Sequence, residues 1–268
     1  MDGAKYVLFG APLDLTTSYR RGTRFGPDAI RQESAYLETY SVRSGLDWED
    51  LDLIDAGNLE CISMESYLDG AERFTSQVNA VPVMLGGEHT ATLGSIRALK
   101  PDLVIVYDAH MDLRDELFGE RVSHATYLRR AFEELNFNLI ILGSRALSRE
   151  EVDFANTNNS IDYFTSFDII NRTKKVEEKV EAAIDDASKV YMSIDMDIID
   201  PGFAPAVGNP APEGVSTNQL VDIISSTMSN KIIGFDLMEV CPHYDSGATA
   251  ITAAYLIMET LYSHIQAS

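Results

Sequence analysis

Six short apolar runs, rich in Val, Ile and Leu and separated by amphipathic stretches, constrain the fold of this chain more than any other feature. The runs lie at residues 6–9, 81–85, 103–107, 139–142, 190–194 and 232–235. The stretches suited to helices lie at residues 66–78, 93–99, 125–135, 174–187 and 217–228. Alternating strands and helices are typical of a parallel sheet, and strands buried on both faces are continuously apolar. The pattern therefore predicts an α/β fold, a three-layer α/β/α sandwich with a mostly parallel central sheet.

The length of the chain is compatible with one large domain, because α/β folds often reach roughly 200–250 residues without dividing. The sequence contains no internal repeat, low-complexity tract or linker that would separate two domains. Residues 201–214, rich in Gly and Pro, are interpreted as a long functional loop. We therefore expect a single domain over residues 1–268.

The charge of the chain limits its partners. Lys and Arg number 21 against 42 Asp and Glu, which gives a formal net charge of -21. Such a chain repels phosphate backbones and anionic lipid, so neither nucleic acid nor a membrane surface is expected as a partner. A solvated surface and an electric field that attracts a cationic ligand both remain explanations of this acidity.

The sequence also favours a cytoplasmic location. No run approaches the roughly 18 apolar residues of a membrane span, and the start of the chain lacks the pattern of a secretory signal. The only two cysteines, Cys61 and Cys241, fit neither a disulfide framework nor a CxxC metal motif.

Polar clusters follow three of the apolar runs. Residues 86–89 are GGEH, residues 108–112 are DAHMD and residues 195–197 are DMD. The carboxyl ends of parallel strands meet at one edge of a sheet, so these clusters are expected to converge. In an extended segment alternate residues share a face, which would place the ligating side chains of each cluster together. The candidate ligands are His89, Asp108, His110, Asp112, Asp195 and Asp197.

This set of side chains favours a pair of metal ions. Carboxylates so close together repel each other unless a cation or a proton compensates. Four carboxylates and two imidazoles are too many for one tetrahedral zinc, and an oxygen-rich set with some imidazole suits Mn²⁺, with Fe²⁺, Co²⁺ and Zn²⁺ as alternatives. Two cations roughly 3.5 Å apart can lower the pKa of a shared water, so metal-assisted hydrolysis is the favoured reaction class.

At this point the sequence resembles the ureohydrolase family, which includes the arginases and agmatinases. The GGEHT, DAHMD and SIDMDIIDP segments resemble the three metal signatures of that family, in the same order. The resemblance continues through GAPLDLTTSYRRGTRFGPDAIR, SHATYLRR, GFAPAVGNP and FDLMEVCP, so it covers nearly the whole chain and is strongest to agmatinases. It implies the arginase-like form of the predicted fold.

The resemblance also implies ligand roles that spacing alone does not supply. It implies two Mn²⁺ per subunit, one held by His89, Asp108, Asp112 and Asp195 and the other by Asp108, His110, Asp195 and Asp197. Asp108 and Asp195 would bridge the two ions.

Three residues have catalytic roles by the same resemblance. His124 would relay protons between solvent, water and the leaving amine, and Glu239 would pair with the guanidinium of the substrate. Asp112 would accept a hydrogen bond from a hydroxide that bridges the metals and attacks the guanidinium carbon.

Agmatine, cleaved to putrescine and urea, is the expected substrate. The SGN-like stretch with which arginases hold the amino acid is absent, and the segment LRDELFGERVSH adds Asp115, Glu116 and Glu120, which suit a dication better than a carboxylate. Guanidinobutyrate or a related guanidino acid, and arginine, remain alternatives. Glu88, Asn209 and Glu213 depart from the common family pattern; Glu88 would act beside the metal ligands, and the other two would border the substrate.

Two other classes of function are alternatives to a ureohydrolase. A non-catalytic protein that binds metal or polyamine would hold manganese without turnover. A two-metal phosphohydrolase would need cationic groups for phosphate. The only tight basic cluster near a predicted strand exit is Arg20, Arg21 and Arg24, and the family resemblance assigns it to the ureohydrolase scaffold. The resemblance also implies a homo-oligomer, a trimer or hexamer.

Overall fold

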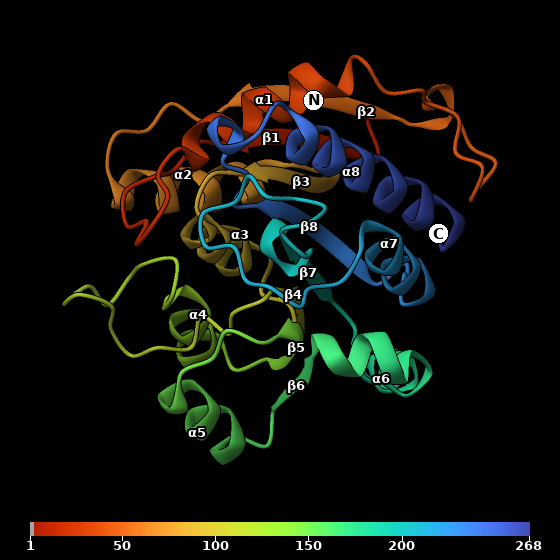
Figure 1. Cartoon of the computed structure of the whole chain (residues 1–268). Helices are drawn as coiled ribbons and strands as arrows, with labels where there is room; N and C mark the ends of the chain where they lie inside the picture. Colours follow the sequence, from red (N-terminus) through yellow and green to blue (C-terminus); the bar gives the residue numbers. More distant parts are fainter. Residues whose placement is uncertain (1–2) are drawn as a thin grey trace.

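The computed structural model describes residues 3–268, and its strands form one parallel sheet in the order β2-β1-β3-β8-β7-β4-β5-β6 (Figure 1). The strands are β1 (Tyr6–Ala11), β2 (Leu53–Asn58), β3 (Val81–Gly86), β4 (Leu103–Tyr107), β5 (Asn138–Ser144), β6 (Ile161–Thr165), β7 (Val190–Asp195) and β8 (Ile232–Met238). Every paired neighbour in the sheet is parallel. The six predicted strands are confirmed, because central parallel strands are buried on both faces and must be apolar.

Helices cover both faces of the sheet. One face packs against α1 (Gly26–Ser34), α6 (Ser166–Asp186), α7 (Thr217–Ser226) and α8 (Ala248–Gln266). The other packs against α2 (Met64–Gln77), α3 (Thr92–Leu99), α4 (Tyr127–Leu135) and α5 (Arg149–Thr157). Figure 1 shows the two groups on opposite sides of the strands. The predicted three-layer α/β/α sandwich is therefore confirmed.

Local sequence sets where several of these helices begin. Ser63, Ser148, Thr165 and Ser216 each precede a helix, and each side chain accepts a hydrogen bond from the backbone N–H three residues later. In each case the side chain of the third helix residue also accepts a hydrogen bond from the backbone N–H of the cap residue. The two hydrogen bonds satisfy two backbone donors that no helical carbonyl can reach. These capping boxes fix the helix starts. Apolar periodicity placed the starts of α2 and α6 at residues 66 and 174, whereas they begin at Met64 and Ser166, and it did not indicate α5.

The two edge strands, β2 and β6, and the nine-residue helices α1 and α5 were not predicted from the sequence. In β2 five of the six residues are exposed, so the segment lacks the apolar run that marks a buried strand. The predicted loop over residues 201–214 is confirmed, since it lies between the short helix η4 (Met196–Ile198) and α7.

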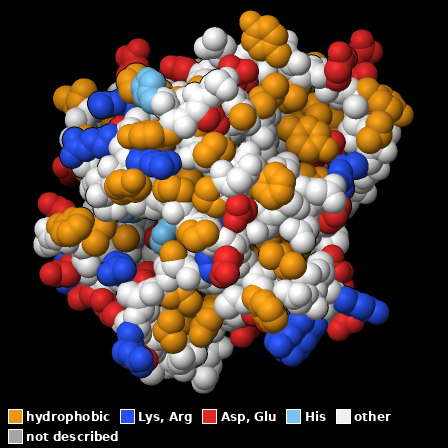
Figure 2. All heavy atoms as spheres, viewed as in Figure 1, with side chains coloured by type: hydrophobic (Ala, Val, Ile, Leu, Met, Phe, Trp, Pro, Cys, Tyr) orange, Lys and Arg blue, Asp and Glu red, His pale blue; other side chains and the backbone are white. Residues whose placement is uncertain are grey.

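The described residues contain no helix long and apolar enough to cross a membrane. On the face drawn in Figure 2, acidic and basic side chains are interspersed, and no broad basic surface is visible. Cys61 and Cys241 are both free.

Candidate metal centre

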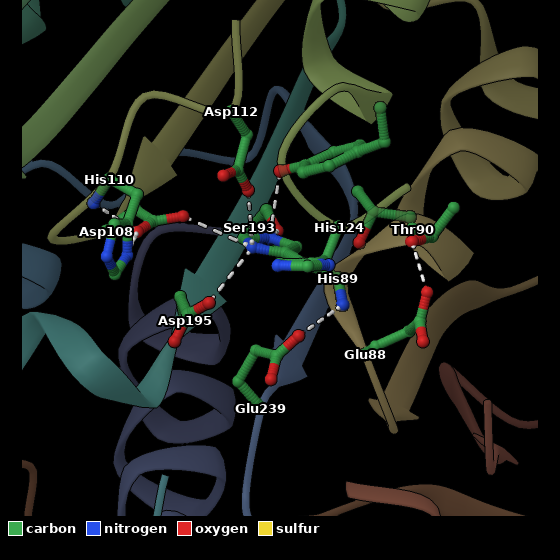
Figure 3. Close-up of polar contacts among 12 residues, drawn as sticks. Glu88, His89, Thr90, Asp108, His110, Asp112, His124, Ser193, Asp195 and Glu239 are labelled. Atoms are coloured by element: carbon green, nitrogen blue, oxygen red, sulfur yellow. Dashed lines mark hydrogen bonds and ion pairs between the residues drawn. The ribbon is translucent and has the colours of Figure 1, made fainter. Parts of the chain in front are cut away.

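The predicted ligands come from the carboxyl ends of neighbouring strands at the centre of the sheet. His89 follows β3, residues 108–112 follow β4, Asp195 ends β7 and Asp197 lies in η4. Glu239 follows β8, which lies between β3 and β7 in the sheet. Figure 3 shows the side chains of Asp108, Asp112 and Asp195 directed toward His89. The convergence predicted from strand exits is confirmed.

The side chains form two groups that share Asp108. His89, Asp108 and Asp195 each offer one ligand atom within 4.8 Å of the others, and so do Asp108, His110 and Asp197. His110 Nδ1 lies 2.9 Å from Asp197 Oδ2. These two groups could hold metal ions.

The geometric reason given for the convergence is only partly correct. Strand β4 ends at Tyr107, the chain bends at Ala109 and His110, and Asp112 has a φ of 53°, so residues 108–112 are not a continuous extended segment. The bent segment nevertheless brings Asp108 and Asp112 to His89 and directs His110 toward Asp197. A non-glycine residue in the left-handed region is strained, and such strain concentrates at functional sites.

The ring of His89 shows that this centre needs a positive charge. Its Nδ1 lies 3.2, 3.5 and 3.1 Å from carboxylate oxygens of Asp108, Asp112 and Asp195, respectively, and makes no hydrogen bond. Its Nε2 lies 2.8 Å from Ser193 Oγ. A lone pair that faces carboxylate oxygens is repelled unless a cation or a proton lies between them.

A buried chain of hydrogen bonds surrounds the other nitrogen of His89. Ser193 Oγ donates to Asp236 Oδ1 at 2.5 Å, so Ser193 can accept a proton from His89 Nε2, and the hydroxyl of Tyr127 lies 2.9 Å from the same nitrogen. Asp236 also accepts from the hydroxyl groups of Tyr191 and Thr92. The chain leaves Nδ1 as the free nitrogen, which is the arrangement of a metal-ligating histidine.

Burial of so many carboxylates shifts their proton affinities. Burial and the neighbouring Asp108 raise the pKa of Asp112 well above its usual range. Burial, together with Asp197 and Asp108, does the same to the pKa of Asp195. Burial lowers the pKa of His89, but the facing carboxylates of Asp108 and Asp112 outweigh it and raise that pKa to about 9. Protons compensate the charge here when no cation does, so this donor set fits metal binding.

Glu239 lies on the other side of His89. Its Oε1 accepts a hydrogen bond from the His89 backbone N–H at 2.8 Å, and its own backbone N–H donates to Gly87 O. The residue has a φ of 66° and is buried, and burial raises its pKa to about 8. The Oε2 atom faces Gly208, where a Cβ would approach it to 2.7 Å.

His124 contacts a loop that follows β1. Its ring Nδ1 lies 3.3 Å from Thr16 Oγ1, and its Nε2 lies 3.1 Å from Ser18 Oγ. Burial lowers the pKa of His124, which favours the neutral ring. The hydroxyl groups of Thr16 and Ser18 were not identified from the sequence as site groups. Both lie in the segment near the start of the chain, GAPLDLTTSYRRGTRFGPDAIR, that resembles agmatinases.

These residues surround a cavity of about 380 Å³. It is lined by Ser18, His89, His110, Asp112, Arg114, Leu117, Phe118, His124, Ala125, Ala146, Glu151, Asp195, Asp197, Asn209 and Glu239. Asn209 borders the cavity as expected, whereas Glu213 does not contribute to its wall.

The acidic residues used to predict the substrate lie elsewhere. Asp115 pairs with Arg130 at 2.9 Å, and Asp115, Glu116 and Glu120 are all absent from the cavity wall. The same segment instead lines the cavity with Arg114 and the apolar side chains of Leu117 and Phe118. The local preference for a dication therefore cannot come from the acids of this segment.

Known proteins resemble the chain over nearly its whole length. A model of the Arginase family matches residues 4–262. The chain is 35% identical to an agmatinase of Pyrococcus horikoshii, over 95% of this chain and 90% of that protein. It is 36% identical to an N(1)-aminopropylagmatine ureohydrolase of Thermococcus kodakarensis, over 96% and 90% of the two chains, respectively.

A solved structure agrees with these relatives. The agmatine ureohydrolase of Thermoplasma volcanium superimposes with a TM-score of 0.91 and 38% sequence identity, and the match covers 98% of this chain and 90% of that one. The correspondence therefore includes the fold as well as the sequence.

Proposed function

This chain belongs to the arginase family and is a hydrolase of guanidino C–N bonds, and we propose that its substrate is agmatine, which it cleaves to putrescine and urea. The observation that carries the proposal is the buried His89 Nδ1, which faces three carboxylates without a hydrogen bond. It identifies a centre built for cations, beside a carboxylate, Glu239, whose second oxygen is directed at the loop over residues 201–214.

The proposal includes two Mn²⁺ per chain. Residues His89, Asp108, Asp112 and Asp195 would hold one ion, and Asp108, His110, Asp195 and Asp197 the other. The two groups of ligand atoms that share Asp108 support the proposed bridging role of Asp108, whereas the inclusion of Asp112 and the bridging role of Asp195 rest on the family resemblance. When bound, such a pair of ions supplies a strong oxygen nucleophile at neutral pH, because it lowers the pKa of water.

Glu239 is proposed to bind and orient the guanidinium. Its Oε1 is held by the His89 backbone N–H, which fixes the carboxylate and leaves Oε2 to accept an N–H of the substrate. A charge-assisted hydrogen bond between a guanidinium and a buried carboxylate is strong and directional. The raised pKa of Glu239, about 8, would fall when the cationic substrate binds, since opposite charge favours the ionised carboxylate.

Asp112 and His124 are proposed to handle protons. Asp112 lies in the cavity wall beside His89, where its carboxylate can accept a hydrogen bond from the attacking water and align it. His124 lies in the same wall, and its neutral ring can take up a proton at one nitrogen and transfer it to the departing amine. Without that transfer, the amine would leave as an unstable anion.

Glu239 is the carboxylate of the cavity wall that supports a cationic substrate. Three of the five carboxylates in the wall, those of Asp112, Asp195 and Asp197, are proposed metal ligands, and Glu151 lies beside Arg114, the single guanidinium there. The Nε atom of Arg114 lies 3.8 Å from Glu151 Oε2, so part of its charge is compensated. Names of the similar proteins also favour agmatine over arginine.

The decisive experiment measures urea release by the Mn²⁺-loaded protein from agmatine, arginine and 4-guanidinobutyrate. Metal-dependent urea from agmatine, with little from the other two compounds and none from Asp108→Ala, would support the proposal. Preferential release from 4-guanidinobutyrate or arginine would reassign the substrate within the family. Bound manganese without turnover of any guanidino compound would indicate a binding protein.

The remaining family-level proposals are testable on the same preparation. We propose that residues 1–268 form a single ureohydrolase domain and assemble as a trimer or hexamer in the cytoplasm. Analytical ultracentrifugation gives the mass of the assembly, and one cooperative unfolding transition would support a single domain.

A further inference from the structure

Glu88 is a buried carboxylate that receives hydrogen bonds from two segments. Its side chain is 0% exposed. Its Oε2 accepts from the backbone N–H groups of Leu15 and Thr16 at 2.6 and 2.7 Å, and its Oε1 accepts from the hydroxyl groups of Thr16 and Thr90, both at 2.6 Å. A carboxylate has about four lone-pair sites, so these donors satisfy it. Glu88 therefore acts as an acceptor and fixes the loop that contains Thr16.

The hydroxyl of Thr16 has one proton, which it donates to Glu88. Its two lone pairs are then available to other donors. The backbone N–H of His124 donates to Thr16 Oγ1 at 3.1 Å, and the ring Nδ1 of the same histidine lies 3.3 Å from that oxygen. Because the hydroxyl proton is already committed to Glu88, Nδ1 can form this contact only by donating its own proton.

This polarity determines which nitrogen of His124 is basic. When Nδ1 carries the proton of a neutral ring, Nε2 has the lone pair. Nε2 lies 3.1 Å from the hydroxyl of Ser18, and His124 and Ser18 both line the cavity (Figure 3 shows Glu88, Thr90 and His124). The Ser18 hydroxyl can donate to Nε2, or rotate to Asn209 Oδ1 at 3.4 Å when Nε2 is protonated.

We propose that Glu88, acting through the hydroxyl of Thr16, is a positioning residue that holds neutral His124 as the Nδ1–H tautomer, with Nε2 as its proton-accepting atom. The inference rests on the proposed function, because it specifies the atom through which His124 would transfer protons. It differs from the sequence-based expectation that Glu88 acts beside the metal ligands. Its side chain hydrogen-bonds to Thr16, Leu15 and Thr90 and not to a proposed ligand.

The charged groups around His124 do not account for the tautomer. Burial lowers its pKa, the negative charge of Glu88 raises it, and His110 and His89 lower it when they are protonated. These effects change the population of the charged ring. The hydrogen-bond polarity of Thr16 acts on the neutral ring alone, so it is measurable separately.

The test compares Thr16→Val with Thr16→Ser. Valine has nearly the shape of threonine but cannot accept the Nδ1 proton, whereas serine retains the hydroxyl. Thr17→Val is the matched control, because Thr17 Oγ1 donates to Asp14 in the same loop and contacts neither Glu88 nor His124. Glu88→Gln is a second perturbation: its amide oxygen must face the backbone N–H groups of Leu15 and Thr16, which can only donate, so its NH₂ group faces the Thr16 hydroxyl and cannot accept that proton.

The first readout is the ring ¹⁵N NMR spectrum of histidine-labelled protein loaded with diamagnetic Zn²⁺, with His124 assigned by His124→Asn. We expect the Nδ1–H tautomer in the parent, Thr16→Ser and Thr17→Val, and a shift toward Nε2–H in Thr16→Val and Glu88→Gln. The second readout is kcat for urea release, which should fall roughly 10-fold or more in Thr16→Val and stay within about threefold in Thr16→Ser, since general acid–base transfer contributes at least about 100-fold.

Three results would overturn the inference: an Nε2–H ring in the parent protein, an unchanged tautomer in Thr16→Val, or a changed tautomer with full kcat. A similar loss of kcat in Thr17→Val would do the same, because it would assign the effect to loop structure. Absence of activity toward every guanidino compound would refute the proposed function, while the NMR result would still decide the tautomer.

Discussion

Replacing Gly208 by alanine tests the proposed role of Glu239 while keeping its carboxylate. A Cβ at position 208 would lie 2.7 Å from Glu239 Oε2, closer than side-chain carbons normally approach an oxygen. The other oxygen already accepts the His89 backbone N–H, so Oε2 is the atom available to a guanidinium. Glu239 is buried on a left-handed backbone, which limits its freedom to move aside. The added methyl group should therefore cover or displace Oε2.

The expected loss follows from one charge-assisted hydrogen bond. Such a bond contributes about 1.5–3 kcal/mol, and about 1.4 kcal/mol corresponds to a tenfold change in rate. We expect Gly208→Ala to lower kcat/KM for agmatine roughly 10- to 100-fold with manganese content unchanged. The assay is urea release over a range of agmatine concentrations.

Gly202→Ala is the matched control for this experiment. Gly202 lies in the same loop but is exposed, and its Cβ would approach Asp200 at 3.0 Å rather than Glu239. A surface substitution of this kind should change kcat/KM less than about threefold. A folded Gly208→Ala protein with full metal content and parental kcat/KM would refute the reasoning.

Three further outcomes are expected. Chelation, or Asp108→Ala, should remove bound manganese and urea release together, which elemental analysis and the activity assay check; activity that persists after complete chelation would contradict the proposed centre. His264 is buried, and its Nδ1 accepts a hydrogen bond from Tyr6 OH at 2.9 Å; burial lowers its pKa. The unfolded chain therefore takes up a proton on this histidine at a higher pH than the folded chain, so the free energy of unfolding falls as the pH drops below about 6.5. His264→Gln should reduce the loss of stability between pH 7 and pH 5 in urea unfolding, and an equal loss would count against this assignment. The guanidinium of Arg145 donates to four backbone carbonyls, including that of Asp197. Arg145→Met should therefore lower the free energy of unfolding by about 2–4 kcal/mol and the thermal midpoint in calorimetry by roughly 5–10 °C. An unchanged midpoint would show that water replaces these hydrogen bonds.

The strands that could be predicted from the sequence are those whose apolar residues have a single physical cause, burial on both faces. Strands at the centre of a parallel sheet are buried on both faces, so their apolar runs located β1, β3, β4, β5, β7 and β8. Edge strand β2 is held by backbone hydrogen bonds to β1 on one side and is otherwise exposed, so its sequence, LIDAGN, carries little apolar signal. Its position depends on pairing, which a local pattern does not encode.

The site likewise has features that the sequence predicts and features that it does not. Residues that follow buried strands could be predicted to converge, because strand exits share an edge of the sheet. The conformation after the strand could not: Asp112 and Glu239 both have positive φ values, which are uncommon for non-glycine residues, and Glu has no preference for them. The acids at positions 115, 116 and 120 show the opposite error, since their charge suggested a substrate contact but Asp115 is paired with arginines away from the cavity.

The order of the strands explains why this centre depends on segments that are far apart in the sequence. His89 and Asp108 follow β3 and β4, which are consecutive in sequence but are separated in the sheet by β8 and β7. Strands β7 and β8 come later in the sequence than β3 and β4; β7 contributes Asp195, and β8 leads to Glu239. The carboxylate of Asp195 lies 3.1 Å from His89 across 106 residues of sequence. Because the ligands of the proposed centre follow strands that are far apart in the sequence, the centre can form only when β7 and β8 have completed the middle of the sheet.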